Sequence, residues 1–225
     1  MTSLADLTGK AMPWGDRPGF GIRATRLPEL EFAYEQGFDF VDLDFNRRDE
    51  ILVNGCALRS RATELGVAFT AHGAGRMFDA GTGYEDTVKD LTTAAAFAPL
   101  SFTIHPIMHW RFSPEELVDK ANRVAALSAA AAPYGIVVCM ENIIEDASHF
   151  AAVLTQTPAL GVTLDIGHAE LLAEENKSYQ FIEQYFDRIV HVHIHDDRGG
   201  NTVKDDLHLE VGEGSIDYPR IIGQL

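Results

Sequence analysis

The sequence predicts an α/β fold in which strands and helices alternate. Short apolar runs begin near residues 38, 67, 102, 136, 161 and 189, at intervals of 29, 35, 34, 25 and 28 residues. Each interval is the length of one strand–helix unit with parallel strands. A (β/α)8 barrel of the TIM type consists of such units and takes about 200–250 residues. The 225 residues of this chain therefore suit one barrel.

The predicted strands are short, rich in β-branched or aromatic residues, and bounded by glycine, proline or polar residues. They cover residues 38–43, 67–70, 101–104, 136–140, 161–164 and 189–194, with a weaker candidate at 20–22. Helices are predicted at 27–36 and 86–96, with another ending at 183–188. The clearest helix covers 114–132, because Ser113 and Glu116 form a capping box around Pro114.

No eighth strand follows the seventh. After Gly214 the sequence has a turn and a short helical segment up to Leu225. We therefore expect one barrel domain over residues 1–225 that is truncated at its C-terminus. A doubly wound open sheet is the alternative, but the phosphate-binding glycines usual after its first strand are not evident. An incomplete barrel exposes two strand edges, which favours a homo-oligomer.

The composition limits the partners. The 18 Lys and Arg residues against 34 Asp and Glu give a net charge of −16. Such a chain repels nucleic acids and acidic lipid surfaces unless a basic groove or a bound metal offsets the field. Cys56 and Cys139 form no metal-binding motif and are expected to be reduced. Without a signal-peptide pattern or a long apolar stretch, the sequence predicts a cytoplasmic protein.

Histidines and carboxylates gather where the predicted strands end. The residues are His72, His105, Glu141, Asp165 with His168, His193, and then Asp206 with His208. In a barrel these strand ends meet on one face, which is where active sites lie. A mixture of carboxylates and imidazoles is typical of Zn, Mn, Fe or Co sites. The sequence therefore predicts a divalent metal ion that polarises a carbonyl or activates water.

Three histidines alternate on the last strand. His191, His193 and His195 share one face of the sheet, so that one or more of them points into the barrel. We assign His193 to the metal and His191 to a lower interior layer. His109 and His149 lie beyond their strands and are interpreted as surface or loop residues.

These residues resemble the xylose isomerase-like barrel superfamily, which holds sugar isomerases, sugar epimerases and endonuclease IV. The resemblance covers residues 38–218 and keeps the order of the motifs. The segments that carry it are Thr70–His72, Ile104–Pro106, Met140–Asn142, Leu164–His168, His193–Asp196 and Asp206–His208 followed by Gly212–Gly214.

The resemblance to the isomerases and epimerases implies one divalent metal ion (Mn, Co, Mg or Zn) and a carbohydrate substrate. Glu141, Asp165 and His193 match three of the four metal ligands, and Glu141 also matches one of the two acid/base glutamates. The second glutamate would follow an eighth strand, and Glu213 in its Gly-Glu-Gly turn is a weak substitute. The resemblance assigns substrate contact and catalysis to His168. Arg198, one residue off the epimerase spacing, and Asn142 complete the expected substrate-binding set.

Two further functions remain open. The resemblance to endonuclease IV implies a zinc phosphodiesterase with three ions. His72, His105 and Glu141 would hold the first ion, Glu141, Asp165 and His193 the second, and His168, Asp206 and His208 the third. The missing eighth strand suggests instead a degenerate barrel that binds sugars without catalysis. The metal-dependent isomerase or epimerase is the main hypothesis.

Overall fold

The computed structural model describes residues 12, 14–15, 17–77, 82–106, 108 and 112–225. Its contacts divide the chain into two compact units. The N-terminal unit consists of Thr2–Ile104 and Leu127–Val138, and the C-terminal unit of His105–Ala126 and Cys139–Leu225.

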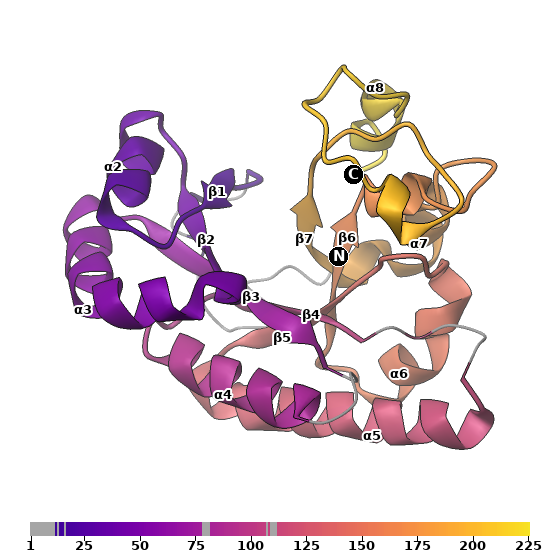
Figure 1. Cartoon of the computed structure of the whole chain (residues 1–225), viewed down its shortest axis with the longest axis horizontal. Coiled ribbons are helices and arrows are strands. Elements are labelled where there is room, and N and C mark those ends of the chain that lie inside the picture. The colour runs from indigo at the N-terminus through magenta and orange to yellow at the C-terminus, as the bar shows by residue number, and fades with distance from the viewer. Residues whose placement is uncertain (1–11, 13, 16, 78–81, 107, 109–111) are drawn as a thin grey trace. The chain divides into compact units, whose positions relative to one another are not determined.

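Seven strands follow one another in the sheet in chain order, alternating with helices (Figure 1). The strands are β1 (Gly21–Arg23), β2 (Phe40–Asp44), β3 (Ala68–Arg76), β4 (Ser101–His105), β5 (Val137–Glu141), β6 (Gly161–Asp165) and β7 (Ile189–His193). The registers of β1–β2, β2–β3, β5–β6 and β6–β7 are parallel. No eighth strand occurs among the residues that the structure describes. The fold class predicted from the sequence, a (β/α) barrel without its eighth strand, is confirmed.

The helices are α2 (Leu27–Glu35), α3 (Arg48–Leu65), α4 (Gly83–Ala95), α5 (Pro114–Ala131), α6 (Ala151–Gln156), α7 (Ser178–Tyr185) and α8 (Tyr218–Ile222). The capping box predicted for α5 is confirmed. Ser113 N donates to Glu116 Oε2 at 2.7 Å, and Glu116 N donates to Ser113 Oγ at 3.3 Å. After α5 the chain makes a 3-10 turn, Ala132–Tyr134, which Gly135 ends with a left-handed φ of 64°.

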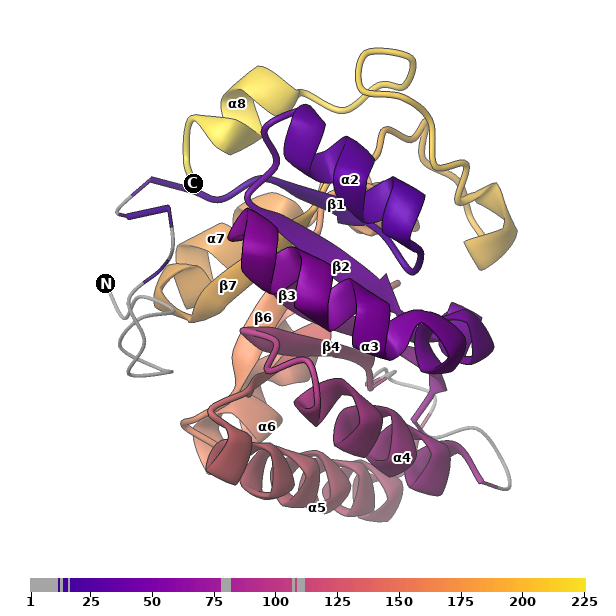
Figure 2. The ribbon, with the colours of Figure 1, turned by 90° about the vertical axis from the view of Figure 1, so that its left-hand side faces the viewer.

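In the N-terminal unit, α2 and α3 lie side by side along β1–β3 (Figure 2). The helix α3 has no counterpart among the helices predicted from the sequence. Its buried positions are Ile51, Gly55, Leu58 and Ala62, which have helical spacing, but a glycine replaces a large apolar residue in that stripe. The ring of Phe97 explains the glycine, because it lies 3.1 Å from where a Cβ at position 55 would stand.

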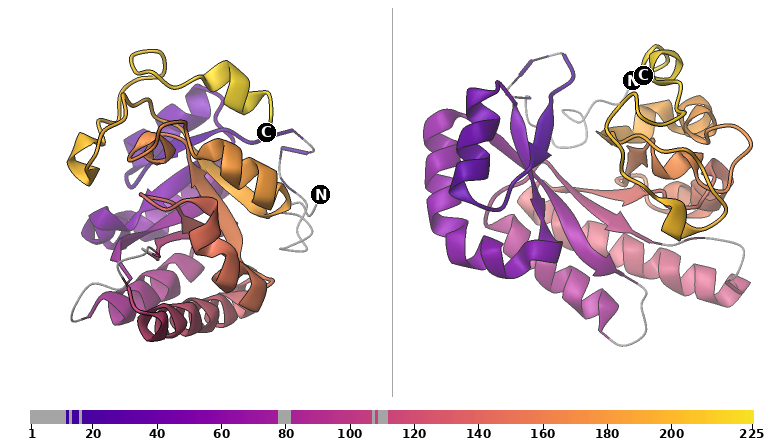
Figure 3. Two further views of the ribbon diagram at one scale, coloured as in Figure 1. Left: turned by 90° about the vertical axis from the view of Figure 1, so that its right-hand side faces the viewer. Right: turned by 45° about the horizontal axis from the view of Figure 1, so that its top comes forward.

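In the C-terminal unit, α7 lies along β6, and the aromatic pair Phe150–Phe181 fills the space beside it with ring centroids 5.3 Å apart. A long connection runs from β7 to α8 and holds one 3-10 turn, Val203–Asp205 (Figure 3). The polar residues at issue lie at the ends of β5, β6 and β7 and on this connection.

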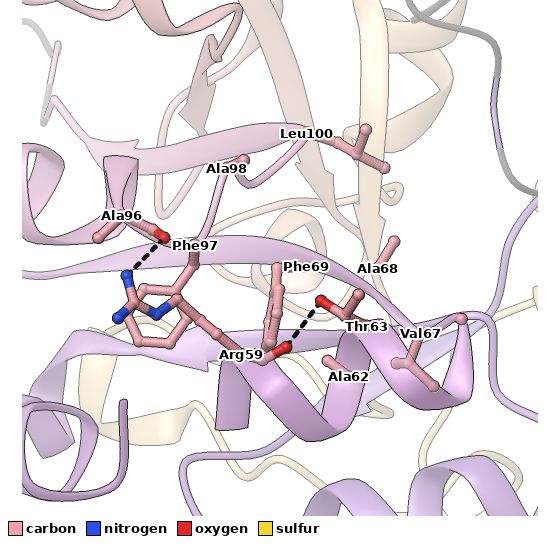
Figure 4. A pocket seen from close by; sticks show the side chains of 11 residues that line it. Arg59, Ala62, Thr63, Val67, Ala68, Phe69, Ala96, Phe97, Ala98 and Leu100 are labelled. Carbon is pink, nitrogen blue, oxygen red and sulfur yellow. Dashed lines mark hydrogen bonds between the residues drawn. The ribbon is translucent and has the colours of Figure 1, made fainter. Parts of the chain in front are cut away.

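One cavity of about 390 Å³ lies elsewhere, in the N-terminal unit (Figure 4). Val67 and Leu100 place it where β3 and β4 begin. Arg59 lines the cavity, with its Nη1 donating to Ala96 O at 3.1 Å and its guanidinium over the ring of Phe97. Its lining residues all belong to the N-terminal unit, and none of them is among the ligand-type residues selected from the sequence.

Cys56 is exposed and Cys139 is buried, and among the described residues neither forms a disulfide. Among the described helices, none combines the length and the apolar character needed to cross a bilayer.

Candidate functional site

Strand ends place the first group of ligand-type side chains in the C-terminal unit. Glu141, Asp165 and His193 are the last residues of β5, β6 and β7, and Asp165 and His193 are partners in the β6–β7 register. Glu141 and Asp165 are fully buried, with 1 % and 2 % of their surface exposed. Because an unpaired buried carboxylate is costly, both must be compensated locally.

Imidazole rings provide that compensation. His193 Nδ1 lies 3.2 Å from Glu141 Oε1 and 3.6 Å from Asp165 Oδ2. On the other side of Glu141, His105 Nε2 lies 3.1 Å from its Oε2. We call Glu141, Asp165 and His193 the inner cluster.

Asn142 fixes the backbone under the inner cluster. Its Nδ2 donates to Asp165 O and its Oδ1 accepts from Asp165 N, both at 2.9 Å. Its own carbonyl oxygen lies 2.9 Å from His168 Nδ1. Asn142 is fully buried, and both ends of its side-chain amide are used in this pair. It therefore acts on the ligands through their main chain.

His168 stands between two groups of ligands. A carbonyl oxygen can only accept, so the 2.9 Å contact with Asn142 O places a proton on His168 Nδ1. The opposite nitrogen, Nε2, faces Asp206 Oδ2 at 3.3 Å. Fixing the tautomer through one ring nitrogen leaves the other available as a metal ligand.

A second group of ligands surrounds that nitrogen. We call its members the outer cluster: His168, His195, Asp206 and His208. One ligand atom from each lies within 4.8 Å of the others. The rings of His195 and His208 stack with centroids 3.9 Å apart, and His208 Nε2 lies 2.9 Å from Asp206 Oδ2. Gly167 makes room for this arrangement, because a Cβ there would overlap the ring of His195.

The loop that carries Asp206 and His208 is folded around two buried aspartates. Asp196 accepts from Gly212 N at 2.7 Å. Asp197 accepts from Gly199 N and from Leu207 N, both at 2.8 Å. Because both carboxylates accept hydrogen bonds from backbone amides, the role of Asp196 and Asp197 is to shape the loop.

His208 itself adopts a left-handed backbone conformation, with φ 49°. Such a conformation is unusual for a residue other than glycine and costs about 1 kcal/mol or more. The surrounding bonds of the loop hold it there, and this places the His208 ring against His195.

The charges of the inner cluster stabilise one another. Burial alone would raise the pKa of Glu141, but His193 and His105 lower it well below its usual range. Burial would likewise raise the pKa of Asp165, but His193 and His195 lower it to about 2. Burial would lower the pKa of His193, but Glu141 and Asp165 outweigh that effect and raise it to about 10. At neutral pH these are carboxylates beside an imidazolium.

The outer cluster follows the same rule. Burial would lower the pKa of His168, but Asp206 and Glu141 raise it to about 11. Burial would raise the pKa of Asp206, but His168 and His208 lower it below its usual range. A divalent cation would replace the protons on these rings and supply the positive charge that they carry without it.

The donor atoms fit a metal ion. His195 Nε2 lies 2.9 Å from Asp165 Oδ1, yet the contact does not have hydrogen-bond geometry. Asp206 Oδ1 is buried and accepts no hydrogen bond from the described residues. Buried polar atoms that converge without bonding one another are what a cation site requires. The carboxylate and imidazole mixture suits Zn, Mn or Co.

The C-terminal unit brings together all but two of the residues selected from the sequence. His72 lies on β3 in the N-terminal unit, so its role as a ligand stays a prediction. Arg198 is exposed, and its Nη2 donates to Glu213 O at 3.1 Å. Its role in substrate binding also stays a prediction.

Three histidines outside the selected set have different outcomes. His195 belongs to the outer cluster and was not selected, although its alternation with His193 was the signal that could have found it. His149 accepts from Asp146 N at 3.2 Å and completes a capping box in a short 3-10 helix. His109 lies outside the described residues.

A family model described as the xylose isomerase-like TIM barrel matches residues 30–225. The chain belongs to this family. The match covers every residue of both clusters, so the resemblance inferred from the strand-end motifs is confirmed.

Solved structures support the fold of the family. A D-tagatose 3-epimerase-like protein is 21 % identical, with a TM-score of 0.72 over 92 % of this chain and 86 % of that one. The IOLI protein, solved with a zinc atom, is 15 % identical, with a TM-score of 0.72 over 91 % and 84 %. An AP endonuclease, family 2, from Brucella melitensis is 17 % identical, with a TM-score of 0.68 over 92 % and 86 %. The likeness to each is one of fold.

Two curated relatives come from Methanocaldococcus jannaschii, and both are uncharacterized proteins. One is 31 % identical over 132 residues, which are 52 % of this chain and 42 % of that protein. The other is 41 % identical over 59 residues, 26 % of this chain and 20 % of that protein. The matched segments thus span less than half the length of these relatives.

Proposed function

We propose that this chain is a divalent-metal-dependent isomerase or epimerase acting on a sugar, a sugar phosphate or a related hydroxy-carbonyl compound. The observation that carries the proposal is the inner cluster, in which two buried carboxylates and an imidazole end three successive strands of a family barrel. The epimerase-like neighbour and the neighbour with bound zinc agree with this function.

Glu141, Asp165 and His193 would hold the ion. When bound, the ion supplies a positive charge that polarises the carbonyl and acidifies the neighbouring C–H bond. At neutral pH Glu141 is ionised, because neighbouring histidines hold its pKa low. It is therefore in the form that accepts a proton from carbon.

Two histidines stand where they would assist Glu141. His105 lies 3.1 Å from Glu141 Oε2 and is placed to pass a proton to or from that oxygen. His168 donates its Nδ1 proton to Asn142 O, so its ring is fixed in orientation beside the site. In the proposed reaction His168 orients a substrate hydroxyl, and Arg198 contributes a cation from the loop after β7.

The first test is metal content together with proton exchange. Protein purified without chelator is analysed by mass spectrometry, then stripped, reloaded with Mn, Co, Mg or Zn, and incubated in D₂O with ketoses, ketose phosphates and inositol-derived ketones. We expect about one ion per chain at the inner cluster and deuterium incorporation at the carbon next to the carbonyl, detected by NMR.

Glu141→Gln is expected to abolish this exchange. The matched control is Glu183→Gln, the same change at an exposed position on α7, and it should retain wild-type rates. Exchange that survives Glu141→Gln would refute the assignment of Glu141 as the base. Metal binding without turnover on any carbonyl substrate would favour a non-catalytic sugar-binding barrel.

The outer cluster favours one second candidate, a zinc phosphodiesterase. Its four ligand-type residues lie next to the inner cluster, and adjacent metal ions are suited to activate water and to clamp a phosphate. The net charge of −16 argues against a DNA substrate and favours a small phosphoester. Two or three zinc ions per chain with phosphoester hydrolysis, and no carbon proton exchange, would establish this candidate instead.

A further inference from the structure

Lys177, just before α7, is buried with only 7 % of its surface exposed. Its Nζ donates to two main-chain carbonyl oxygens, Ile144 O at 3.1 Å and Leu171 O at 2.5 Å. Hydrogen bonds from an ionised donor are stronger than neutral ones, and a buried ammonium is retained only where such partners exist. Lys177 therefore joins two segments that are distant in the sequence.

The first segment is the turn that follows Glu141. The buried carboxylate of Glu145 shapes it, since its Oε2 accepts from Ile143 N at 2.9 Å and from Ile144 N at 3.0 Å. Burial lowers the pKa of Lys177, and the charges of Glu145 and Asp146 oppose that effect. Lys177 thus interacts with this turn in two ways. Its Nζ donates to Ile144 O, and the ammonium is attracted by the negative charges of Glu145 and Asp146.

The second segment follows Asp165 and His168. Leu171 N donates to His168 O at 3.1 Å, so the carbonyl that Lys177 holds belongs to the turn that places the His168 ring. Its neighbour Leu172 has a left-handed φ of 53°, and its N–H donates to Gly200 O at 2.8 Å. Gly200 lies on the loop that carries Asp206. Through Leu171 and Leu172, Lys177 therefore reaches a third segment.

We propose that Lys177 is a positioning residue for the candidate metal centre. Its ammonium ties the turn after Glu141 to the turn after His168, and Leu172 of that second turn bonds to the loop that carries Asp206. Lys177 thereby sets the spacing of ligands that it does not touch. This inference rests on the proposed function, because the property that Lys177 controls is metal affinity.

Arg188 provides the matched control. It is also a partly buried cation that donates to main-chain carbonyls, with Nε 2.9 Å from Leu160 O and Nη2 3.1 Å from Thr157 O. These carbonyls precede β6, at the end of the strand opposite Asp165. Losing either cation leaves two carbonyls without their donor. The bonds of Arg188 lie where β6 and β7 begin, at the far ends of these strands from Asp165 and His193, whereas Lys177 binds the turns that directly follow ligands.

The experiment compares Lys177→Met with Arg188→Met, because methionine keeps the length of the side chain. Both metal-stripped variants are titrated with Zn²⁺ against a competing chelator dye, at a temperature where circular dichroism shows both folded. We expect Lys177→Met to weaken Zn²⁺ binding at least about tenfold, as changes behind metal ligands do. Arg188→Met should stay within about twofold of wild type, although both variants melt at lower temperature.

Chemical rescue distinguishes the effect of the ammonium charge on metal affinity from the effect of side-chain packing. Lys177→Cys in a Cys56→Ser background is treated with bromoethylamine, which restores an ammonium at nearly the same length. We expect affinity to return to within about threefold of wild type. Because position 177 is itself buried, the alkylation is carried out on the unfolded chain before refolding. The exposed Cys56 is removed because it would react, and Cys139→Ala is added because the buried Cys139 would react in the unfolded chain.

Two results would overturn the inference: equal Zn²⁺ affinities for the two methionine variants, or no recovery on aminoethylation. Hydrogen exchange, measured on the metal-free proteins, tests this inference separately from the proposed function. If wild type binds no metal, the proposed function fails. Faster exchange at the Leu172 amide in Lys177→Met, but not in Arg188→Met, would then still support the tie between the segments, and unchanged exchange would refute it.

Discussion

The inner and the outer cluster consist of the same types of side chain, carboxylates and imidazoles, but different parts of the structure hold them in place. Glu141, Asp165 and His193 end strands, so the hydrogen-bond register of the sheet places them. Asp206 and His208 lie on the connection between β7 and α8, which is held by its own aspartates. The side chain of His208 is 52 % exposed, whereas that of Glu141 is 1 % exposed. A sheet places ligands rigidly, and a loop places them only as well as its own bonds do.

This difference predicts unequal metal affinities. The inner cluster has fixed, buried carboxylates, so ion binding there needs little reorganisation. The outer cluster must keep His208 in a costly backbone conformation while it binds. We therefore expect the inner cluster to fill first during a titration with metal ions.

The largest effect is expected from Asp165→Asn. The change removes a charge that faces His193, His168 and His195 at once. We expect metal affinity to fall by more than about 100-fold, beyond what loss of an indirect partner costs, and turnover to vanish while the fold is largely retained. Calorimetric titration and circular dichroism measure the two parts. Wild-type activity in this variant would show that the site is wrongly assigned.

A large effect of pH on stability is expected next, and its sign depends on the metal. The pKa of His168 is raised to about 11 and that of His193 to about 10, against 6.5 for the ordinary side chain. Raised values stabilise the folded state fully below pH 6.5, and that stability is lost as the pH rises toward 10–11. Each group contributes a slope of up to about 1.4 kcal/mol per pH unit.

Urea unfolding in the presence of a chelator, at pH 6.5, 7.5 and 8.5, measures this slope. We expect the metal-free protein to lose stability as the pH rises. With saturating Zn²⁺ the trend should weaken or reverse, because the metal binds the deprotonated rings and its affinity grows with pH. A metal-free protein that gains stability over this range would contradict the charge states described for both clusters.

A smaller effect, confined to the outer cluster, is expected from Gly167→Ala. The added Cβ would overlap the ring of His195 and push it from its stack with His208. In titrations with excess Zn²⁺, we expect binding at the outer cluster to weaken about tenfold and binding of the first ion at the inner cluster to stay unchanged. Gly66→Ala is the control, because its left-handed φ of 70° imposes strain with no neighbour within 4 Å. Equal loss at both ions would refute the separation of the clusters.

The smallest effect is expected from His149→Gln. The ring accepts from Asp146 N in a capping box at the start of a short 3-10 helix. We expect a loss of at most about 1 kcal/mol in the free energy of unfolding, the usual cost of a weakened cap. Metal affinity and turnover should equal those of wild type. A change in either would extend the functional site beyond the two clusters.

The sequence predicts the inner cluster better than the outer one for a physical reason. A polar residue directly after a buried apolar run, such as Glu141, can be placed at a strand end from the sequence alone. The position of His208 depends on a left-handed backbone angle and on distant amides that bind Asp196 and Asp197. Such long-range bonds leave no periodic pattern in the sequence.

The missed elements follow the same logic. The long helix α3 was not predicted because Gly55 replaces an apolar residue in its buried stripe, and only the position of Phe97 explains that glycine. His195 was not selected because its alternation with His193 shows a shared face and does not show which neighbours meet that face. Lys177 carried no signal, since its partners are carbonyl oxygens and every residue has one.

The carboxylate of Asp197 closes the loop after β7 into a ring of its own. One oxygen accepts from Gly199 N and the other from Leu207 N, so the segment between them begins and ends on the same side chain. Exposed residues such as Asn201 and Thr202 lie at the outer end of this ring. Extra residues inserted directly before Asn201 would lengthen the ring while its two ends stay on Asp197 and the amides of Asn201 and Thr202 stay on Asp205. The protein thus offers an engineer a place to graft new recognition residues beside the metal centre while Asp206 stays where it is.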